Sequence, residues 1–168
     1  MHERNNTCCF TGHRKIPTSE LDHIKQSLNK ALTSLIEKGI TCFCAGGALG
    51  FDTLAAQTVL SLKEKYPHIQ LILVLPCVNQ SKSWNDEDKA VYEAIKKQSD
   101  EVIYTSEHYF RGCMQVRNRA LVDRSCVAVC YLTESTGGTA YTVKYAEKNG
   151  LKVINLVKTQ TELPLNDT

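Results

Sequence analysis

Three short apolar runs of this chain each end in a loop that contains glycine, and a helical pattern of apolar residues follows each loop. The runs cover residues 7–12, 40–45 and 126–132. Strands that alternate with helices in this way favour a mostly parallel sheet covered by helices on both faces. The sequence therefore predicts an α/β fold, a three-layer sandwich built around a mostly parallel sheet.

The rest of the chain continues this alternation. Residues 69–75 are almost continuously apolar, as is typical of a strand that is buried on both faces. Further elements are predicted as a helix around residues 90–95, a strand over 102–104, a helix over 114–124 and a strand over 151–157. No linker or low-complexity segment interrupts the pattern, so we expect a single domain over residues 1–168.

The polar stretch from Asn79 to Asp86 is predicted to be a mobile loop. It contains Trp84, the only tryptophan of the chain. Two roles for this side chain stay open, because an indole ring can stack on the base of a ligand or anchor the loop to the core.

Charged residues are nearly balanced, with 20 basic and 18 acidic residues and a formal net charge of +2. They are spread along the chain without a basic block, so nucleic acid is not expected as a partner. No apolar run approaches the roughly 20 residues of a membrane span, and the N-terminal residues are too polar for a signal peptide. We therefore expect a soluble, cytoplasmic protein without a membrane partner. Whether it forms a homo-oligomer stays open.

The eight cysteines lack the spacing of a zinc site, because the chain has no Cys-x-x-Cys pair. Neither a metal nor a disulfide is expected. Cys77 and Cys113 lie nearer to predicted loops, and their roles stay open. The others fall in predicted strands, where a reduced thiol is a small buried hydrophobic group: Cys8, Cys9, Cys42, Cys44, Cys126 and Cys130.

A binding site is expected where the glycine-containing loops meet. In parallel sheets, ligands bind at the carboxyl ends of the strands, near the point where the strand order reverses. Gly137 and Gly138 allow the backbone to approach a ligand closely, and the N–H groups that open the next helix favour an anion. The residues of the three loops that we expect to bind a phosphate-bearing ligand are Gly12, His13, Arg14, Gly46, Gly47, Gly50, Asp52, Gly137, Gly138, Thr139 and Thr142.

The charged and polar members of this set have alternative roles. Arg14 suits bidentate pairing with a phosphate. His13 is expected either to donate to the ligand or to be an ordinary loop residue. Asp52 begins a helix, where a carboxylate stabilises the helix dipole without any ligand, and its functional alternative is a hydrogen bond from a ribose hydroxyl.

Four motifs follow one another along the chain. They are Cys-Phe-Thr-Gly-His-Arg at 9–14, Gly-Gly-Ala-Leu-Gly-Phe-Asp at 46–52, Arg-Asn-Arg-Ala-Leu-Val-Asp-x-Ser at 117–125 and Gly-Gly-Thr-Ala-Tyr-Thr at 137–142. In this order and spacing they resemble the YpsA-like family of the SLOG superfamily over almost the whole chain. The resemblance implies a Rossmann-like fold and a nucleotide-related ligand such as ADP-ribose or NAD, in a regulatory or sensor role. It adds Arg117 and Asn118 to the expected ligand-binding residues.

One departure from the superfamily bears on catalysis. The related phosphoribohydrolases carry a Pro-Gly-Gly-x-Gly-Thr-x-x-Glu pattern whose glutamate assists glycosidic cleavage, and Thr142 stands in its place here. Catalytic residues are therefore unknown, and ligand binding is favoured over hydrolysis. N-glycosidic hydrolysis, with Asp52 or Asp123 as the carboxylate, is the first alternative. Single-stranded DNA binding is the second, since DNA-processing members share the motif at 46–52, but the charge balance argues against it.

Overall fold

The computed structural model describes residues 3–158 and contains one six-stranded sheet. Every pair of neighbouring strands is parallel, and the order across the sheet is β4-β3-β2-β1-β5-β6. This confirms the predicted α/β fold with a parallel sheet. The strands are β1 (Thr7–Gly12), β2 (Cys42–Ala45), β3 (Gln70–Leu75), β4 (Glu101–Tyr104), β5 (Val127–Tyr131) and β6 (Lys152–Asn155).

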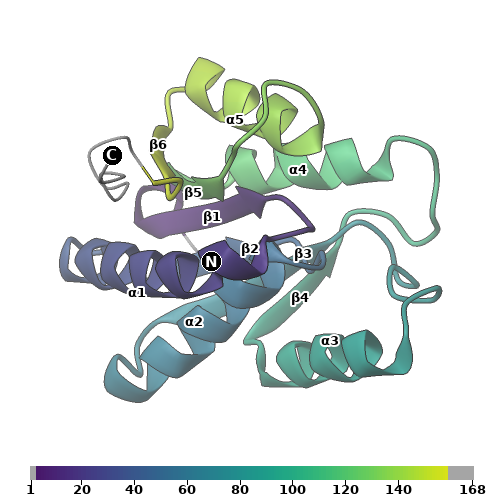
Figure 1. The fold of residues 1–168 in the computed structure, drawn as a ribbon, viewed down its shortest axis with the longest axis horizontal. Coiled ribbons are helices and arrows are strands. Elements are labelled where there is room, and N and C mark those ends of the chain that lie inside the picture. The colour runs from purple at the N-terminus through teal and green to yellow at the C-terminus, as the bar shows by residue number, and fades with distance from the viewer. Residues whose placement is uncertain (1–2, 159–168) are drawn as a thin grey trace, which may run out of the picture.

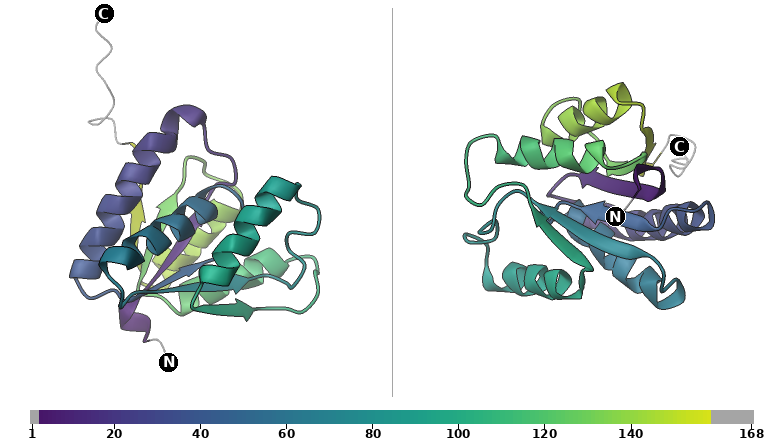
Figure 2. Two further views of the ribbon diagram at one scale, coloured as in Figure 1. Left: turned by 90° about the horizontal axis from the view of Figure 1, so that it is seen from below. Right: turned by 180° about the vertical axis from the view of Figure 1, so that it is seen from behind.

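Helices cover both faces of the sheet, as predicted (Figure 1). One face carries α1, α2 and α3, which Figure 2 shows in front of the strands in its left view, and the other carries α4 and α5. Two 3₁₀ turns, Arg4–Asn6 and Thr18–Glu20, precede β1 and α1. The helices are α1 (Leu21–Glu37), α2 (Phe51–Lys65), α3 (Asp86–Gln98), α4 (Cys113–Asp123) and α5 (Gly138–Lys148).

Local sequence explains where α1 ends. Gly39 has a φ of +104°, a left-handed conformation that glycine adopts without steric cost. Its N–H donates to Ile36 at 3.1 Å, and the N–H of Ile40 donates to Leu35 at 3.0 Å. These two bonds satisfy carbonyl groups of the last helical turn, so the chain turns from α1 toward β2 at Gly39.

Alternate residues of the strands build two hydrophobic cores. In β1, Phe10 belongs to the core under α1, α2 and α3, whereas Cys9 belongs to the core under α4 and α5. All eight cysteines are free thiols, and all are buried except the half-buried Cys126. The six cysteines that were predicted to pack as small hydrophobic groups therefore lie in or beside the strands. Cys77 and Cys113 are buried as well.

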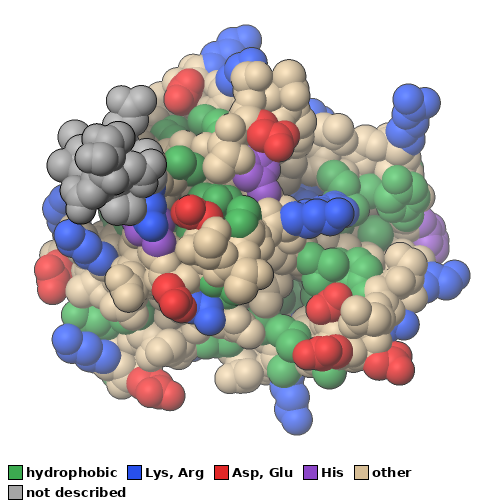
Figure 3. Space-filling view, viewed as in Figure 1, with side chains coloured by type: hydrophobic (Ala, Val, Ile, Leu, Met, Phe, Trp, Pro, Cys, Tyr) green, Lys and Arg blue, Asp and Glu red, His purple; other side chains and the backbone are tan. Residues whose placement is uncertain are grey.

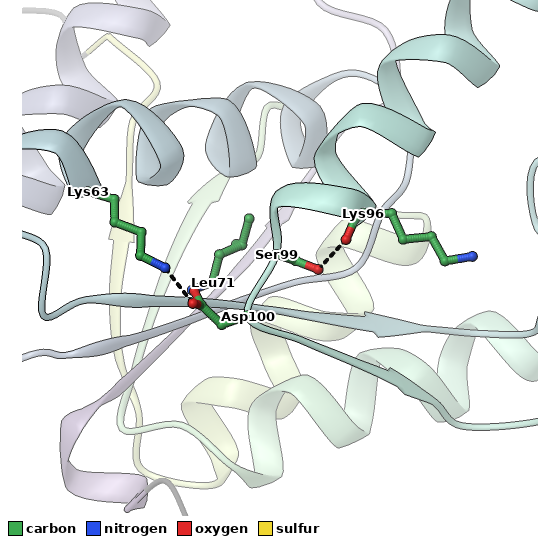
Figure 4. A network of polar contacts seen from close by, with 5 residues as sticks. All are labelled: Lys63, Leu71, Lys96, Ser99 and Asp100. Carbon is green, nitrogen blue, oxygen red and sulfur yellow. Dashed lines mark hydrogen bonds and ion pairs between the residues drawn. The ribbon is translucent and has the colours of Figure 1, made fainter.

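A polar network connects α2 with the amino ends of β3 and β4 (Figure 4). Asp100 accepts a hydrogen bond from the N–H of Leu71 at 2.8 Å and forms an ion pair with Lys63 of α2. The network joins α2 to two strands. These contacts lie at the amino ends of β3 and β4, and loops follow the carboxyl ends of the strands.

The loop before α3 is anchored by its tryptophan. Trp84 packs edge-on against Tyr92, with 5.2 Å between the ring centroids, and contacts the core under α1, α2 and α3. This arrangement supports the anchoring role rather than base stacking.

Within residues 3–158, no helix combines the length and the apolar character that crossing a membrane requires.

Candidate functional site

A cavity of about 350 Å³ lies where the strand order reverses, at the carboxyl ends of β1 and β5. This is the place at which open parallel sheets bind their ligands. The predicted residues that line it are Gly12, His13, Arg14, Asp52, Arg117, Asn118, Gly137, Gly138 and Thr139. Sequence reasoning missed other lining residues, among them Ala48, Met114, Glu134 and Thr136.

The glycines after β2 shape the cavity without lining it. A Cβ at Gly46 would lie 2.8 Å from Arg117 Nη1, and a Cβ at Gly47 would collide with Leu75. A Cβ at Gly50 would collide with the carbonyl oxygen of Arg14. These glycines make room for neighbouring protein atoms, whereas the sequence had suggested that they approach a ligand.

His13 connects the exits of β1 and β5. Its Nε2 accepts a hydrogen bond from the backbone N–H of Thr133 at 2.9 Å, and its ring meets the edge of Tyr131 at a centroid distance of 5.8 Å. Its carbonyl oxygen accepts from the N–H of Phe51 at 3.1 Å. His13 therefore holds three segments of the cavity wall together, which is a third role beside the two predicted for it.

Arg117 and Asp52 form the buried centre of the site, with side chains that are 4% and 6% exposed. Arg117 Nη1 donates to the carbonyl of Gly46, and Arg117 Nε donates to Asn118 Oδ1 at 2.9 Å. Asp52 Oδ2 accepts from the N–H of Ala48 at 3.2 Å. Asp52 Oδ1 is buried and has no hydrogen-bond partner among residues 3–158.

Burial shifts the pKa values of both groups. It raises the pKa of Asp52 from its ordinary 3.8 to about 6, although Arg117, the Ala48 amide and Arg14 act in the opposite direction. Burial also lowers the pKa of Arg117, and Asp52 opposes that shift. The guanidinium stays charged, so the cavity holds a cation beside a carboxyl group that titrates near neutral pH.

The Asp52 shift predicts a pH-dependent stability. The folded protein holds the Asp52 proton more tightly than the unfolded chain does. The ionised carboxylate therefore lowers the free energy of unfolding fully above pH 6. This destabilisation decreases as the pH falls from 6 to 4 and disappears below pH 4. Asp52→Asn removes this titration. We expect the free energy of unfolding of the variant minus that of the wild type to fall by about 2 kcal/mol between pH 8 and pH 4. Urea unfolding of both proteins measures it, and a difference independent of pH would refute the assigned shift.

The first turn of α5 opens onto the cavity. Gly137 precedes the helix with a φ of +99° and provides no side-chain cap, so the first N–H groups of α5 lack partners within the helix. A Cβ at Gly138 would meet no atom within 4 Å. Thr142 does not line the cavity, because its side chain is buried and its hydroxyl donates to the Gly138 carbonyl at 2.8 Å.

Asp123, one of the two carboxylates considered for catalysis, does not line the cavity. It accepts a hydrogen bond from the hydroxyl of Tyr145 at 2.7 Å on the exposed side of α4 and α5. The carboxylates that line the cavity are Asp52 and the exposed Glu134. A lone glutamate in a polar loop carries no local signal that sequence reasoning could have used.

Comparison with known proteins agrees with this fold and with the four motifs. The model of the YpsA SLOG family matches residues 8–160. The chain belongs to this family. A UPF0398 protein of Bacillus pumilus is 32% identical over 130 residues, which are 76% of this chain and 70% of that protein. UPF0398 protein BH1768 of Halalkalibacterium halodurans is 30% identical over 131 residues, 76% of this chain and 69% of that protein. The SLOG resemblance is thereby confirmed.

Solved structures share the fold of this YpsA-family protein. DNA processing protein A from Helicobacter pylori, whose structure concerns single-stranded DNA binding, aligns with a TM-score of 0.65 and 19% identity over 93% of this chain and 67% of that one. DNA processing protein A from Streptococcus pneumoniae aligns with a TM-score of 0.64 and 15% identity, over 89% of this chain and 49% of the other. At these identities the likeness establishes the fold.

Proposed function

We propose that this protein binds a phosphate-bearing nucleotide, such as ADP-ribose or NAD, in the cavity between β1 and β5, in a recognition role. The observation that carries the proposal is the start of α5, where Gly137 and Gly138 line the cavity and no side chain caps the first N–H groups of the helix. Such N–H groups and the helix dipole favour an anion. The cavity volume is within the range of small-molecule sites.

Arg14 supplies the second element of anion binding. Its side chain is exposed at the cavity and forms no hydrogen bond or ion pair with residues 3–158. A guanidinium in this position can pair with two phosphate oxygens at once. Arg117 adds positive charge from the buried side, but its N–H groups already donate to Gly46 and Asn118. Phosphate contact is therefore assigned to Arg14 and the first turn of α5.

Gly138→Ala tests the proposal because it separates stability from binding. The added methyl group meets no protein atom, and alanine favours the helix over glycine by about 0.5–1 kcal/mol. We expect the free variant to melt slightly above the wild type. Its methyl group projects where the ligand would approach, so most of the thermal shift that ADP-ribose or NAD gives the wild type should disappear.

The matched control is Ser61→Ala, an exposed change in the later part of α2 at a residue that does not line the cavity. This variant should keep the full thermal shift. Chromatography of the recovered ADP-ribose distinguishes binding from hydrolysis. Equal shifts in the wild type and in Gly138→Ala would contradict the proposed site.

Single-stranded DNA binding is the second candidate, favoured by one surface feature. Tyr109 and Phe110 are 67% and 43% exposed, beside Arg111, in the loop that leads into α4. Aromatic rings with nearby cations stack on the bases of single strands. However, Lys and Arg side chains are interspersed with Asp and Glu over the face shown in Figure 3, without a basic groove.

Fluorescence anisotropy with a labelled oligonucleotide decides between the two candidates. Salt-dependent binding that is lost in a Tyr109→Ala, Phe110→Ala double variant would favour DNA. Absence of binding at low salt, together with a nucleotide-dependent thermal shift, would favour the cavity ligand.

A further inference from the structure

We infer that the segment after Lys158 binds in the hollow between α1 and β6, where its acidic and leucine side chains meet lysines and an apolar floor. The hollow has a volume of about 370 Å³ and shares no lining residue with the cavity between β1 and β5. It is therefore a second surface, independent of the nucleotide site. Residues 159–168 themselves lie outside the described part of the chain.

Three lysines border the hollow. Lys30 belongs to α1, Lys38 directly follows that helix, and Lys152 begins β6. All three are exposed, and none forms an ion pair or a side-chain hydrogen bond with residues 3–158. Among the described residues, no aspartate or glutamate lines the hollow. The hollow therefore carries a positive charge that favours an acidic partner.

The floor of the hollow is apolar and adjoins a free strand edge. Its apolar lining includes Leu35, Ile154 and Leu156. β6 is the outermost strand beside β5, and no strand within residues 3–158 pairs with its other edge. Proteins usually cover or charge such an edge, because its N–H and C=O groups can pair with another extended chain. An extended segment that brings leucines would cover both the apolar floor and this edge.

The sequence that follows Lys158 has the matching composition. Residues 159–168 read Thr-Gln-Thr-Glu-Leu-Pro-Leu-Asn-Asp-Thr, with two acidic residues and no basic one. In an extended segment alternate side chains face the same way, so Leu163, Leu165 and Asp167 would share one side. That side carries two apolar groups followed by a carboxylate. It suits an apolar floor with lysines at the far end.

The arrangement of α1 and β6 places the lysines at that far end. At the carboxyl end of β6, His23 Nε2 forms a hydrogen bond with the Leu156 carbonyl at 3.0 Å, and the segment starts near this point. Lys38 and Lys152 lie at the opposite end, where α1 ends and β6 begins. The distance along α1 from His23 to Lys38 is about 22 Å, whereas ten extended residues span up to about 33 Å. The segment can therefore reach both lysines.

Other occupants fit the hollow less well. Pairing of β6 with β6 of a second copy would bring two sets of these lysines together, and charged residues on an edge strand oppose such pairing. An acidic segment of another protein would have to bind from solution. The segment after Lys158 is joined directly to the hollow, and a short connection of this kind gives an effective concentration of the order of millimolar. A weak contact is then sufficient.

A nitroxide spin label on the segment tests the inference in the full-length chain. The native cysteines are buried except the half-buried Cys126, so a Cys126→Ser, Asn166→Cys protein carries the label at the introduced thiol. We expect the label to broaden the amide NMR signals of Ser34, Lys38 and Lys152, which line the hollow. Signals of α3, which does not line it, should keep their intensity.

Charge reversal identifies the contact. Lys38→Glu, Lys152→Glu replaces the attraction for the acidic segment by repulsion, so most of the broadening at Ser34 should disappear. The matched control is Lys89→Glu, Lys97→Glu, which changes the net charge equally on α3. This control should keep the full broadening.

Three results would overturn the inference. The first is the absence of broadening at the hollow, and the second is broadening that both charge-reversed proteins retain equally. The third comes from a mixture of spin-labelled protein with isotope-labelled protein that carries no spin label. Broadening in that mixture would mean that the segment binds a second copy of the chain. None of these results bears on the nucleotide site, which has different lining residues.

Discussion

Gly50→Ala is expected to lower the free energy of unfolding by about 3 kcal/mol or more. Gly50 combines a φ of +78° with a ψ of −118°, a region that essentially only glycine adopts. In addition, a Cβ there would collide with the carbonyl oxygen of Arg14 and would lie 2.7 Å from that of His13. Both obstacles are backbone atoms, so no side-chain rotation relieves them, and the exit of β1 has to move.

Gly39→Ala is the matched control for this prediction. Gly39 also has a positive φ, of +104°, but a Cβ there would meet nothing within 4 Å. Gly39→Ala should therefore lower the free energy of unfolding only through backbone strain, by about 1–2 kcal/mol. Urea unfolding of both variants measures the difference. Equal losses would mean that the contact between Gly50 and the β1 exit contributes nothing to stability.

Arg117→Met is expected to lower the free energy of unfolding by about 3–5 kcal/mol at pH 8. The change leaves the buried Asp52 carboxylate without its main compensating charge, and it removes the donor to the Gly46 carbonyl. At pH 5, where Asp52 is mostly protonated in the folded protein, the loss should be smaller. Urea unfolding at the two pH values measures both quantities.

A double-mutant cycle identifies the origin of this loss. In the Asp52→Asn, Arg117→Met double variant the buried carboxylate is absent, so the total cost should be smaller than the sum of the single costs by about 1–3 kcal/mol. Additive costs would show that Arg117 stabilises the fold independently of Asp52, through its packing and its hydrogen bond to the Gly46 carbonyl. They would contradict the electrostatic account of the pair.

The order of elements could be predicted from the sequence because periodicity and glycines mark where each one begins and ends. The adjacency of β1 and β5 could not, since the strand order depends on packing among distant segments. Thr142 was expected at the site because it lies near the glycine pair. One turn further along α5, its side chain instead faces the core. The unpaired oxygen of Asp52 is likewise visible only once Arg117 and Ala48 are in place.

The glycines show a second limit of sequence reasoning. A glycine-rich loop indicates that something approaches the backbone closely, without indicating whether it is a ligand or the protein itself. Gly12 makes room for Phe51 and Gly46 for Arg117, whereas the position of a Cβ at Gly138 is open. The structure thereby separates glycines that the fold needs, such as Gly12 and Gly46, from Gly138, which lines the cavity and has open space at its Cβ position. Only substitutions of the latter kind report on a ligand.

An amide-resolved NMR titration with ADP-ribose would show where on the protein the ligand binds. We expect the largest chemical-shift changes at Gly138, Thr139 and Gly12, around the cavity between β1 and β5. A competing hollow of about 370 Å³ between α1 and β6 is lined by Lys30, Lys38 and Lys152, and would attract phosphate by charge alone. Chemical-shift changes that concentrate in this second hollow, with the first turn of α5 unaffected, would contradict a nucleotide site between β1 and β5.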